Sequence, residues 1–441
     1  MEITIEKLIY GGEGLAHHEG STVFVPFVLP AERVIAAAVE QKKKFVRAKA
    51  ERIVEPSPER TAAPCPHFGI CGGCDYQHIP YDAQLRYKAE IFRETLRRIG
   101  RVEWAGEITT HASPPWGYRN RAQWKVRPLE NPAADSSVDS GRANLGIGYF
   151  RSNSTVLCAV EDCKIISPLL LKSLLSLREA LAAGAMPRSL REIEAFAGED
   201  DTTLLVTAQF AGFPSHAAEL AEKFRDILPH LGSLLFHDPS RDRMELYGPG
   251  FVECRAGGHS YRVGHFSFFQ VNRFLVDELA REATKAEEPG NLALDLFAGV
   301  GLFSLPLARH FKRVLAIEAN PAAARDLESN VARDPAETGA APRGAIEVRS
   351  ADVDVFLARY RENLDLVLVD PPRAGLSPDT VKHLSRIAPP AITYISCEPP
   401  TLARDLAAIV AGGYDVTEMH LFDLFPQTFH MEAVVQLRKR K

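Results

Sequence analysis

Residues 291–310, NLALDLFAGVGLFSLPLARH, decide the fold that the sequence predicts. An apolar run meets two glycines, Gly299 and Gly301, and an apolar-periodic segment follows from Leu302. This order predicts a strand, a tight glycine turn and a helix. Glycine lets the backbone approach a ligand where a β-carbon would clash, and Asp295 lies at the carboxyl end of the strand. The spacing D-x-F-x-G-x-G differs from the dinucleotide motif G-x-G-x-x-G, so the turn alone could equally serve packing.

Three short apolar strands follow, and each ends in a carboxylate: Glu318, Asp352 and Asp370. Glu318 lies where an acid can bind a ribose diol, and Asp352 could reach an adenine amino group. Asn320 and Pro321 supply the cap and first turn of a helix after the second strand. Each acid alone could equally be a helix cap. Together they predict an open, doubly wound, parallel Rossmann-like sheet with a nucleoside-bearing ligand at its strand ends, a pattern similar to S-adenosylmethionine (SAM)-dependent methyltransferases.

Length and composition set the outer limits of the prediction. The 441 residues suggest about three domains, and contents of 46% hydrophobic and 25% charged residues are those of a globular protein. No run of 18 apolar residues occurs and the chain opens with Met1-Glu2, so we expect a cytoplasmic monomer that does not span a membrane. Because the net charge is -5, any RNA contact would be made by local basic patches.

Residues 1–58 predict a small β-barrel, because short β segments alternate with glycines. Six basic residues lie between Lys42 and Arg52, with Phe45 among them; taken alone, this run is typical of a solvated strand edge. The segment 11–34, GGEGLAHHEGSTVFVPFVLPAERV, followed by this basic strand, resembles the TRAM domain, an OB-like RNA-binding barrel. The resemblance implies that the barrel contacts RNA.

Three cysteines lie within ten residues, Cys65, Cys71 and Cys74, in the pattern C-x5-C-G-G-C. In a cytosolic chain this density predicts metal ligands rather than disulfides. A fourth ligand is usual, with Cys158 and Cys163 the nearest candidates, and the spacing does not choose between zinc and a [4Fe-4S] cluster. The pattern, with its later D-C-x-I, resembles the iron-sulfur members of the RNA (uracil-5-)-methyltransferase family. That resemblance implies a [4Fe-4S] cluster, with Cys163 as its fourth ligand and Cys158 as a core thiol.

Residues 59–265 predict an α+β central domain that carries the cluster. Within it, residues 81–99 form an amphipathic helix with a basic face, which by default serves solubility. Residues 116–125, WGYRNRAQWK, interleave aromatic and basic side chains, which suits base stacking and phosphate pairing but also strand packing. Residues 131–142 predict a polar loop. The same resemblance implies that residues 266–441 form a SAM-dependent methyltransferase domain.

Cys397 follows a fifth apolar strand and is expected at the same sheet edge as Asp370. A cysteine after a strand is usually an inert core residue, but a thiolate beside a cofactor can serve as nucleophile. Glu432 precedes the last strand, where an ordinary glutamate would face solvent. The motifs SCEPPTLARDL, DPPRAGL, DLFAGVGLFSLPLA and FPQTFHMEAVV resemble the same family over the whole chain, closest to the 23S rRNA type that carries both TRAM domain and cluster.

This resemblance implies SAM-dependent methylation of carbon 5 of a uridine in 23S rRNA. It makes Cys397 the nucleophile and Glu432 the general base. Leu302 departs from the family, where relatives often carry a polar residue beside the glycine turn. The residues implied to surround the cofactor and the target base, beside the glycine turn, are Gln270, Phe297, Glu318, Asp352 and Asp370.

Three other functions compete with this one. An amino-group methyltransferase would use N/D-P-P-Y/F, whereas this chain has Arg373 at the last position and would leave Cys397 without a role. Radical methylthiolation enzymes need C-x3-C-x2-C with an open iron site, and here the spacing is C-x5-C-x2-C with a fourth cysteine at hand. The same chemistry on a tRNA uridine stays open, because substrate choice depends on loops that the sequence does not decode.

Overall fold

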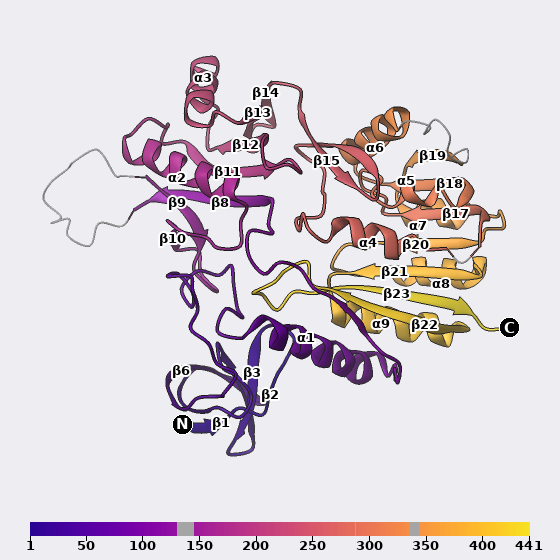
Figure 1. Cartoon of the computed structure of the whole chain (residues 1–441), viewed down its shortest axis with the longest axis horizontal. Helices are drawn as coiled ribbons and strands as arrows, with labels where there is room; N and C mark the ends of the chain where they lie inside the picture. Colours follow the sequence, from indigo (N-terminus) through magenta and orange to yellow (C-terminus); the bar gives the residue numbers. More distant parts are fainter. Residues whose placement is uncertain (130–144, 287, 335–343) are drawn as a thin grey trace, which may run out of the picture.

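The computed structural model describes residues 1–129, 145–286, 288–334 and 344–441, so the predicted polar loop at 131–142 lies outside the described residues. The chain forms three large sheets and a hairpin (Figure 1). In this view the N-terminal sheet lies at the lower left, the central sheet at the upper left and the C-terminal sheet at the right. The mixed α/β architecture agrees with the predicted fold class.

The N-terminal sheet has six strands in the order β1-β5-β6-β4-β3-β2. Register shifts along the β5–β6 pair bend it, because bulges strengthen the local twist. The sheet therefore curls around an apolar core that includes Val23, Val25 and Val34. Among the described residues its edge strands β1 and β2 do not pair with each other, so the predicted barrel is a curled half-barrel. Its strands are β1 (Glu2–Thr4), β2 (Lys7–Leu8), β3 (Glu13–His18), β4 (Ser21–Pro26), β5 (Arg33–Gln41) and β6 (Phe45–Glu55).

The central sheet has seven strands in the order β10-β9-β8-β11-β12-β13-β14, and α2 and α3 pack their apolar faces on it. Ser167 begins α2 by accepting a hydrogen bond from the backbone N–H of Leu170. The hairpin of β15 (Phe251–Ala256) and β16 (His259–Gly264) leads on to the C-terminal sheet. The elements are β8 (Arg121–Pro128), β9 (Leu145–Phe150), β10 (Leu157–Ala159), α2 (Pro168–Ala182), β11 (Leu190–Ala197), β12 (Leu204–Phe210), α3 (Ala217–Ile227), β13 (Leu231–Asp238) and β14 (Arg243–Tyr247).

The C-terminal sheet has the order β19-β18-β17-β20-β21-β23-β22-β7. Its first five strands are mutually parallel, as predicted for a doubly wound sheet, and β23 enters antiparallel to β21. The elements are α4 (Val276–Ala283), β17 (Gly290–Leu296), α5 (Ser304–Leu307), β18 (Phe311–Glu318), α6 (Pro321–Arg333), β19 (Ala345–Ser350), α7 (Val353–Arg359), β20 (Leu366–Val369), α8 (Pro378–Ile387), β21 (Ala391–Ser396), α9 (Pro399–Ala411), β22 (Tyr414–Phe422) and β23 (Glu432–Lys439).

Most predicted elements of this sheet are present, with shifted ends. Asn320 caps α6 as predicted, accepting from the backbone N–H groups of Ala322 and Ala323. The helix predicted directly after the glycine turn is only the short α5, because the chain first forms two turns.

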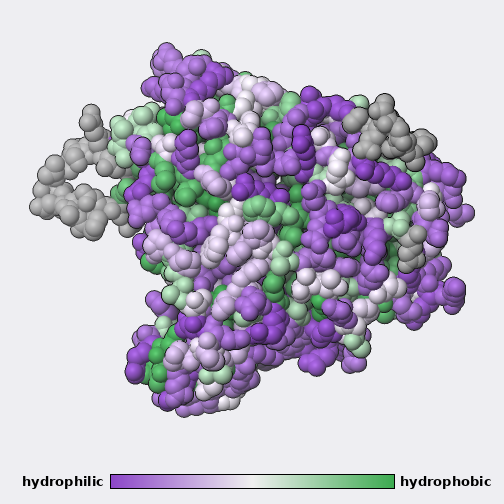
Figure 2. Space-filling view, viewed as in Figure 1, coloured by the Kyte–Doolittle hydropathy of each residue, from purple (hydrophilic) through white to green (hydrophobic). Residues whose placement is uncertain are grey.

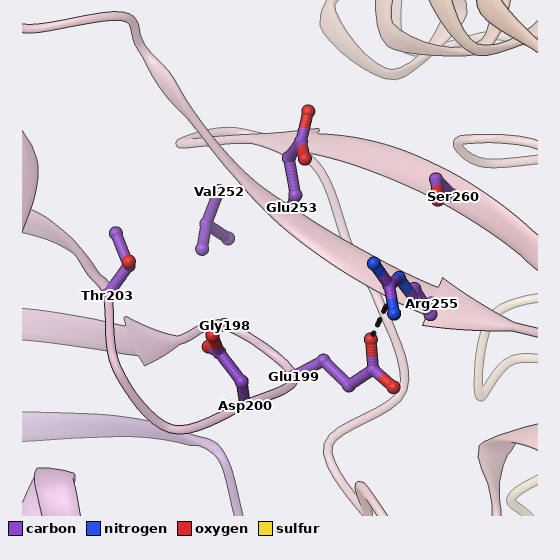
Figure 3. A pocket seen from close by; sticks show the side chains of 8 residues that line it. All are labelled: Gly198, Glu199, Asp200, Thr203, Val252, Glu253, Arg255 and Ser260. Carbon is purple, nitrogen blue, oxygen red and sulfur yellow. Dashed lines mark ion pairs between the residues drawn. The ribbon is translucent and has the colours of Figure 1, made fainter.

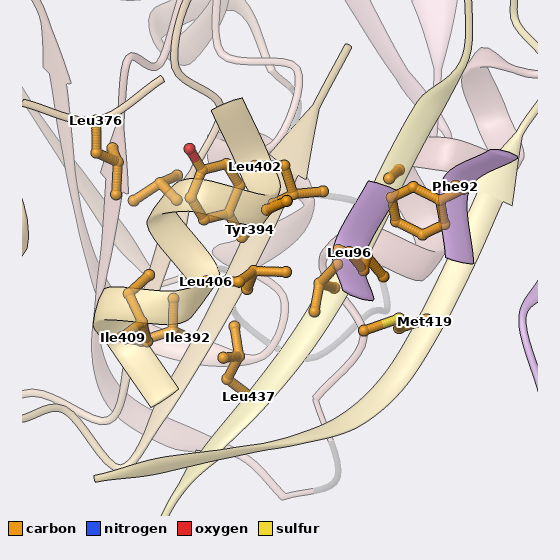
Figure 4. Packing of buried hydrophobic residues seen from close by; sticks show 14 of the residues in the cluster. Phe92, Leu96, Leu376, Ile392, Tyr394, Leu402, Leu406, Ile409, Met419 and Leu437 are labelled. Atoms are coloured by element: carbon orange, nitrogen blue, oxygen red, sulfur yellow. The ribbon is translucent and has the colours of Figure 1, made fainter. Parts of the chain in front are cut away.

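The segment from α1 to β7 joins the C-terminal sheet, although the sequence placed it in the central domain. Helix α1 (Tyr81–Thr95) continues as the π-helical turn η1 (Leu96–Gly100), and β7 (Thr109–His111) pairs in parallel with β22. In Figure 4, Phe92 and Leu96 pack beside Met419 of β22 and Leu402 of α9. Side chains of α1 can therefore reach the loop between β22 and β23.

The surface offers one further general observation. The face of the molecule seen in Figure 2, in the same view as Figure 1, is mostly hydrophilic, with hydrophobic residues in small separate groups. Within the described ranges, none of the helices is both long enough and apolar enough to cross a membrane.

Candidate functional site

A cavity of about 510 Å³ lies at the carboxyl ends of the parallel strands of the C-terminal sheet. The strand order reverses between β17 and β20, and ligands of open α/β sheets bind where the order reverses. Seven residues named from the sequence line it: Gln270, Phe297, Gly299, Glu318, Asp370, Cys397 and Glu432. The structure thus brings residues that are up to 162 positions apart into one cavity.

The two glycines of the turn after β17 serve different purposes. A β-carbon on Gly299 would meet no heavy atom within 4 Å, whereas one on Gly301 would lie 2.4 Å from Leu327 of α6. Gly299 therefore borders open space in the cavity, and Gly301 permits close packing of α6. Phe297 also has a positive φ, 65°, a backbone strain that is common at functional sites.

Glu318 is held at the cavity wall by backbone donors. Its carboxylate accepts hydrogen bonds from the N–H of Gly299 at 2.8 Å and from the N–H of Asn320 at 2.7 Å. Each oxygen keeps a further lone pair, which can accept from a ribose hydroxyl. Asp352 instead caps α7, accepting from Asp354 N and Val355 N, and it is not among the residues that line the cavity.

Cys397 and Glu432 lie next to each other because of strand pairing. The residue before Cys397, Ser396, is paired with Ala433, the residue after Glu432, on the antiparallel strands β21 and β23. Continuing that register by one position places the Cys397 and Glu432 backbones opposite each other, about 5 Å apart. The predicted nucleophile and the predicted base therefore meet at one edge of the sheet.

Burial dominates the electrostatics of this edge. It raises the pKa of the Cys397 thiol to about 12, with Glu432 adding to the rise and Arg373 opposing it. Burial and the nearby Asp295 carboxyl raise the pKa of Asp370 to about 7. The pKa of Glu432 is raised by burial and by Asp370. The repulsion between the Asp370 and Glu432 carboxyls favours a cationic ligand in the cavity.

Sequence reasoning did not assign Arg119, Arg373, Phe266 and Phe268 to the cavity, yet these side chains are among those that line it. Arg119 belongs to the basic-aromatic run at 116–125, and Arg373 to DPPRAGL, so both lay within motifs already singled out. Phe266 and Phe268 line the cavity and remain 48% and 61% exposed. Exposed aromatic rings at the mouth of a cavity suit the stacking of a nucleobase.

A second cavity, of about 300 Å³, gathers the predicted metal ligands. Cys65, Cys71, Cys74 and Cys163 all line it. Cys158 does not; its sulfur lies 4.0 Å from a ring nitrogen of His67. No disulfide joins these cysteines, and among the described residues no three metal-binding side chains converge on one ion position. The structure therefore shows a shared thiol cavity but no preformed single-ion site within its described part.

The thiol cavity and the cavity at the sheet edge share two wall residues, Arg119 and Phe425. Phe425 belongs to the loop 423–431, called here the catalytic-edge loop, which joins β22 to β23 and ends at Glu432. Lys88 of α1 holds this loop: its buried ammonium donates to Asp423 at 2.6 Å and to two backbone carbonyls of the loop.

A third cavity, of about 410 Å³, lies between the β11–β12 turn and the β15–β16 hairpin (Figure 3). Glu199, Asp200 and Glu253 line it, and Arg255 is paired with Glu199 at 3.7 Å. It contains none of the predicted residues. Its excess of carboxylates is unsuited to a polyanion such as RNA.

The chain is similar to several known RNA methyltransferases. A family model described as tRNA (Uracil-5-)-methyltransferase matches residues 255–440. An RNA methyltransferase of Aquifex aeolicus is 32% identical, covering 99% of this chain and 98% of the relative. The 23S rRNA (uracil(1939)-C(5))-methyltransferase RlmD of Halomonas elongata is 34% identical, covering 99% and 89%. The crystal structure of the Pyrococcus abyssi tRNA (uracil-54, C5)-methyltransferase with S-adenosyl-L-homocysteine has a TM-score of 0.73 at 26% identity, covering 99% and 100%.

Proposed function

The chain belongs to the RNA (uracil-5-)-methyltransferase family and is a SAM-dependent enzyme; from this premise we propose that its substrate is a uridine of 23S rRNA. Full-length relatives named as 23S rRNA enzymes support this choice. The single observation that carries the chemistry is that Cys397 and Glu432 line one cavity together with the carboxylates of Glu318 and Asp370.

The cavity has the features that SAM requires. Gly299 leaves open space where a side chain would stand, and the Glu318 carboxylate can accept from ribose hydroxyls. We propose Gln270, Phe297 and Asp370 as further contacts, and Asp352 and Gly301 as supports of the surrounding turns. When bound, SAM supplies a methyl group on a positively charged sulfur, which the buried acids of the cavity favour.

Cys397 activates the target base, because carbon 5 of uracil is a poor nucleophile. The thiol gives its proton to water, its sulfur forms a bond to carbon 6, and the π electrons of the 5,6 double bond move to oxygen 4 as an enolate. These electrons return through carbon 5, which takes the methyl group as S-adenosyl-L-homocysteine leaves. Arg373 beside the sulfur stabilises the thiolate, since it opposes the rise in the pKa of Cys397.

Glu432 completes the reaction by taking the proton from carbon 5. The electron pair of that C–H bond restores the 5,6 double bond as the sulfur leaves carbon 6, which regenerates the Cys397 thiolate. The raised pKa of Glu432 makes its carboxylate a stronger proton acceptor than an exposed one. The target base must leave its stack to be reached, and Phe266 and Phe268 at the mouth can stack on it or its neighbours.

The function is tested by nucleoside mass spectrometry of purified 23S rRNA and tRNA after incubation with enzyme and methyl-labelled SAM. We expect label as 5-methyluridine in 23S rRNA alone. Label in tRNA alone would support the proposed reaction but show that 23S rRNA is not the substrate.

Two variants test the roles at the sheet edge. Cys397→Ala should abolish turnover, because no other group can add to carbon 6. Glu432→Gln should accumulate a covalent enzyme–RNA adduct, because the proton on carbon 5 stays in place. An active Cys397→Ala enzyme would refute the scheme.

We also propose that Cys65, Cys71, Cys74 and Cys163 hold a [4Fe-4S] cluster. The support is their shared cavity, its donor set of four thiols and the adjoining glycine at position 72, where a β-carbon would press on the backbone of Phe150 at 3.2 Å. A cluster takes one thiolate per iron. We propose a structural role, since the methyl transfer needs no electron.

The domain assignments follow the same proposal. Residues 1–58 would act as the RNA-binding TRAM domain, with Lys43, Lys44 and Lys49 exposed on its basic side; 59–265 as the cluster and RNA-binding domain; and 266–441 as the catalytic domain. The cytoplasmic location and the monomeric state stay predictions.

A further inference from the structure

Tyr10 belongs to the N-terminal sheet but lies against the catalytic part of the molecule. It stands in the turn between β2 and β3, and its ring meets Phe429 edge-on, with centroids 5.5 Å apart and planes at 88°. Phe429 lies against His430 at 4.2 Å. Because Phe429 is three residues before Glu432, the N-terminal sheet touches the catalytic-edge loop.

Tyr10 also lies near the other catalytic segment: it lines one cavity with Pro400 at the start of α9. Burial and the nearby carboxylate of Glu398, the residue that follows Cys397, raise the pKa of Tyr10. The hydroxyl oxygen of Tyr10 is shielded from solvent and has no hydrogen-bond partner within the described part of the chain. A buried hydroxyl without a partner is rare in native proteins and calls for an explanation.

Glu398 has a fixed backbone. Its N–H donates to Ser396 Oγ at 3.1 Å, and its carbonyl accepts from Thr401 Oγ1 at 3.0 Å. It occupies the N-cap position of α9, yet its side chain makes no capping bond. The carboxylate can therefore adjust toward Tyr10 without moving the backbone.

The turn that carries Tyr10 is pressed closely against its neighbours. Gly12 has φ +83°, and a β-carbon there would lie 3.3 Å from both the Phe429 ring and Asp75. A β-carbon on Gly11, with φ +106°, would meet nothing within 4 Å. The close approach is thus specific to the side of the turn that faces Phe429.

We infer that Tyr10 is a positioning residue of the active site: its ring supports the catalytic-edge loop, and its hydroxyl donates to Glu398 in the transition state of the reaction. This inference rests on the proposed function. It makes the N-terminal sheet part of the catalytic apparatus, because the Tyr10 ring contacts the loop that leads to Glu432, and Tyr10 lines one cavity with Pro400, three residues after Cys397.

A purely space-filling role predicts a different outcome for Tyr10→Phe. Removing a buried, unpartnered hydroxyl would leave kcat unchanged and leave Tm equal or higher. A positioning role predicts that kcat falls about tenfold, the effect expected when a hydrogen bond to a charged group is lost. The KM for RNA and Tm should stay close to wild type.

The measurement is single-turnover and steady-state methylation of RNA by the full-length enzyme, with Tm recorded for each variant. Tyr87→Phe is the matched control, because the hydroxyl of Tyr87, on α1, donates to Glu59 and neither residue lines the cavity. We expect wild-type kcat for this control. Tyr10→Phe at wild-type kcat would overturn the inference.

A double-mutant cycle with Glu398→Gln tests the partner. If Tyr10 acts through Glu398, adding Tyr10→Phe to Glu398→Gln should change kcat less than twofold. A further tenfold loss in that background would show that Tyr10 acts elsewhere and would overturn the inference. The comparison uses whichever RNA the wild type methylates, and a wild type inactive on both RNAs would count against the proposed function.

Discussion

At the scale of single residues, the cavity combines a raised thiol pKa with two buried acids that repel each other. Asp370 is near its midpoint at neutral pH, since burial and Asp295 raise its pKa to about 7. A cation binds the ionised acid better, so binding of a cation is favoured as pH rises through that pKa. SAM carries a positive sulfur, and S-adenosyl-L-homocysteine does not.

We therefore predict that SAM affinity rises between pH 6 and pH 8 by up to about tenfold, the equivalent of one pKa unit. The affinity for S-adenosyl-L-homocysteine should change much less, because the two ligands share all other ionisable groups. Isothermal titration calorimetry at both pH values measures the difference. Asp370→Asn should reduce the difference in pH dependence between the two ligands. Equal pH dependence for both ligands in the wild type would contradict a contact between Asp370 and the positive sulfur.

At the scale of elements, the helix α1 holds the catalytic-edge loop through a buried ion pair. Lys88 and Asp423 are both fully buried, and their side chains lie 2.6 Å apart. Removing one partner of a buried pair leaves the other charge buried and unpaired, which costs about 3–5 kcal/mol of stability. Lys88 also donates to the carbonyls of Phe425 and His430, so its loss frees the loop that leads to Glu432.

We predict that Lys88→Met lowers the free energy of unfolding by about 3–5 kcal/mol and also lowers kcat. Chemical denaturation measures the first effect. Adding Asp423→Asn should restore part of the stability, because the buried charge is removed. Arg225→Ala is the control: it breaks the exposed pair with Glu222 and should change stability little. Equal effects of Lys88→Met and Arg225→Ala would contradict the prediction.

At the scale of the whole molecule, the active site lies where parts of the chain meet. The turn of the N-terminal sheet reaches Phe429, and the thiol cavity shares Arg119 and Phe425 with the catalytic cavity. The function should therefore respond to changes at either junction.

The glycines of the β2–β3 turn test the first junction. Gly11→Ala and Gly12→Ala both place a β-carbon at positive φ, which costs a similar backbone strain. Only Gly12→Ala also presses on Phe429. We predict that Gly12→Ala lowers kcat well beyond Gly11→Ala at similar loss of Tm, measured by methylation assay and thermal denaturation. Indistinguishable kcat values would show that the junction does not matter for turnover.

The cysteines test the second junction. In anaerobically purified enzyme, Cys163→Ser should lose the visible iron-sulfur absorption and lower Tm, because the proposed cluster would join segments distant in sequence. Cys158→Ser is the matched control and should keep the absorption, since Cys158 lies outside the thiol cavity. If Cys158→Ser lost the absorption and Cys163→Ser kept it, Cys158 would be the fourth ligand in place of Cys163. Absorption retained in both variants would contradict a four-cysteine cluster.

The sequence by itself determined the parallel catalytic sheet, the cap of α6 at Asn320 and the residues that end each strand. These depend on local features: apolar periodicity, glycine turns and carboxylates at strand ends. The motifs also named seven residues that line the catalytic cavity and four that line the thiol cavity.

Tertiary structure alone decided how these parts meet. The transfer of α1 and β7 to the C-terminal sheet, the open edges of the N-terminal sheet and the place of Tyr10 depend on contacts between residues far apart in the chain. It also gave Gly299 and Gly301 different neighbours and left Asp352, a local helix cap, out of the cavity wall. A local sequence pattern determines the backbone conformation of a residue. The side chains that the residue contacts depend instead on how the whole molecule packs, and no single stretch of sequence specifies that packing.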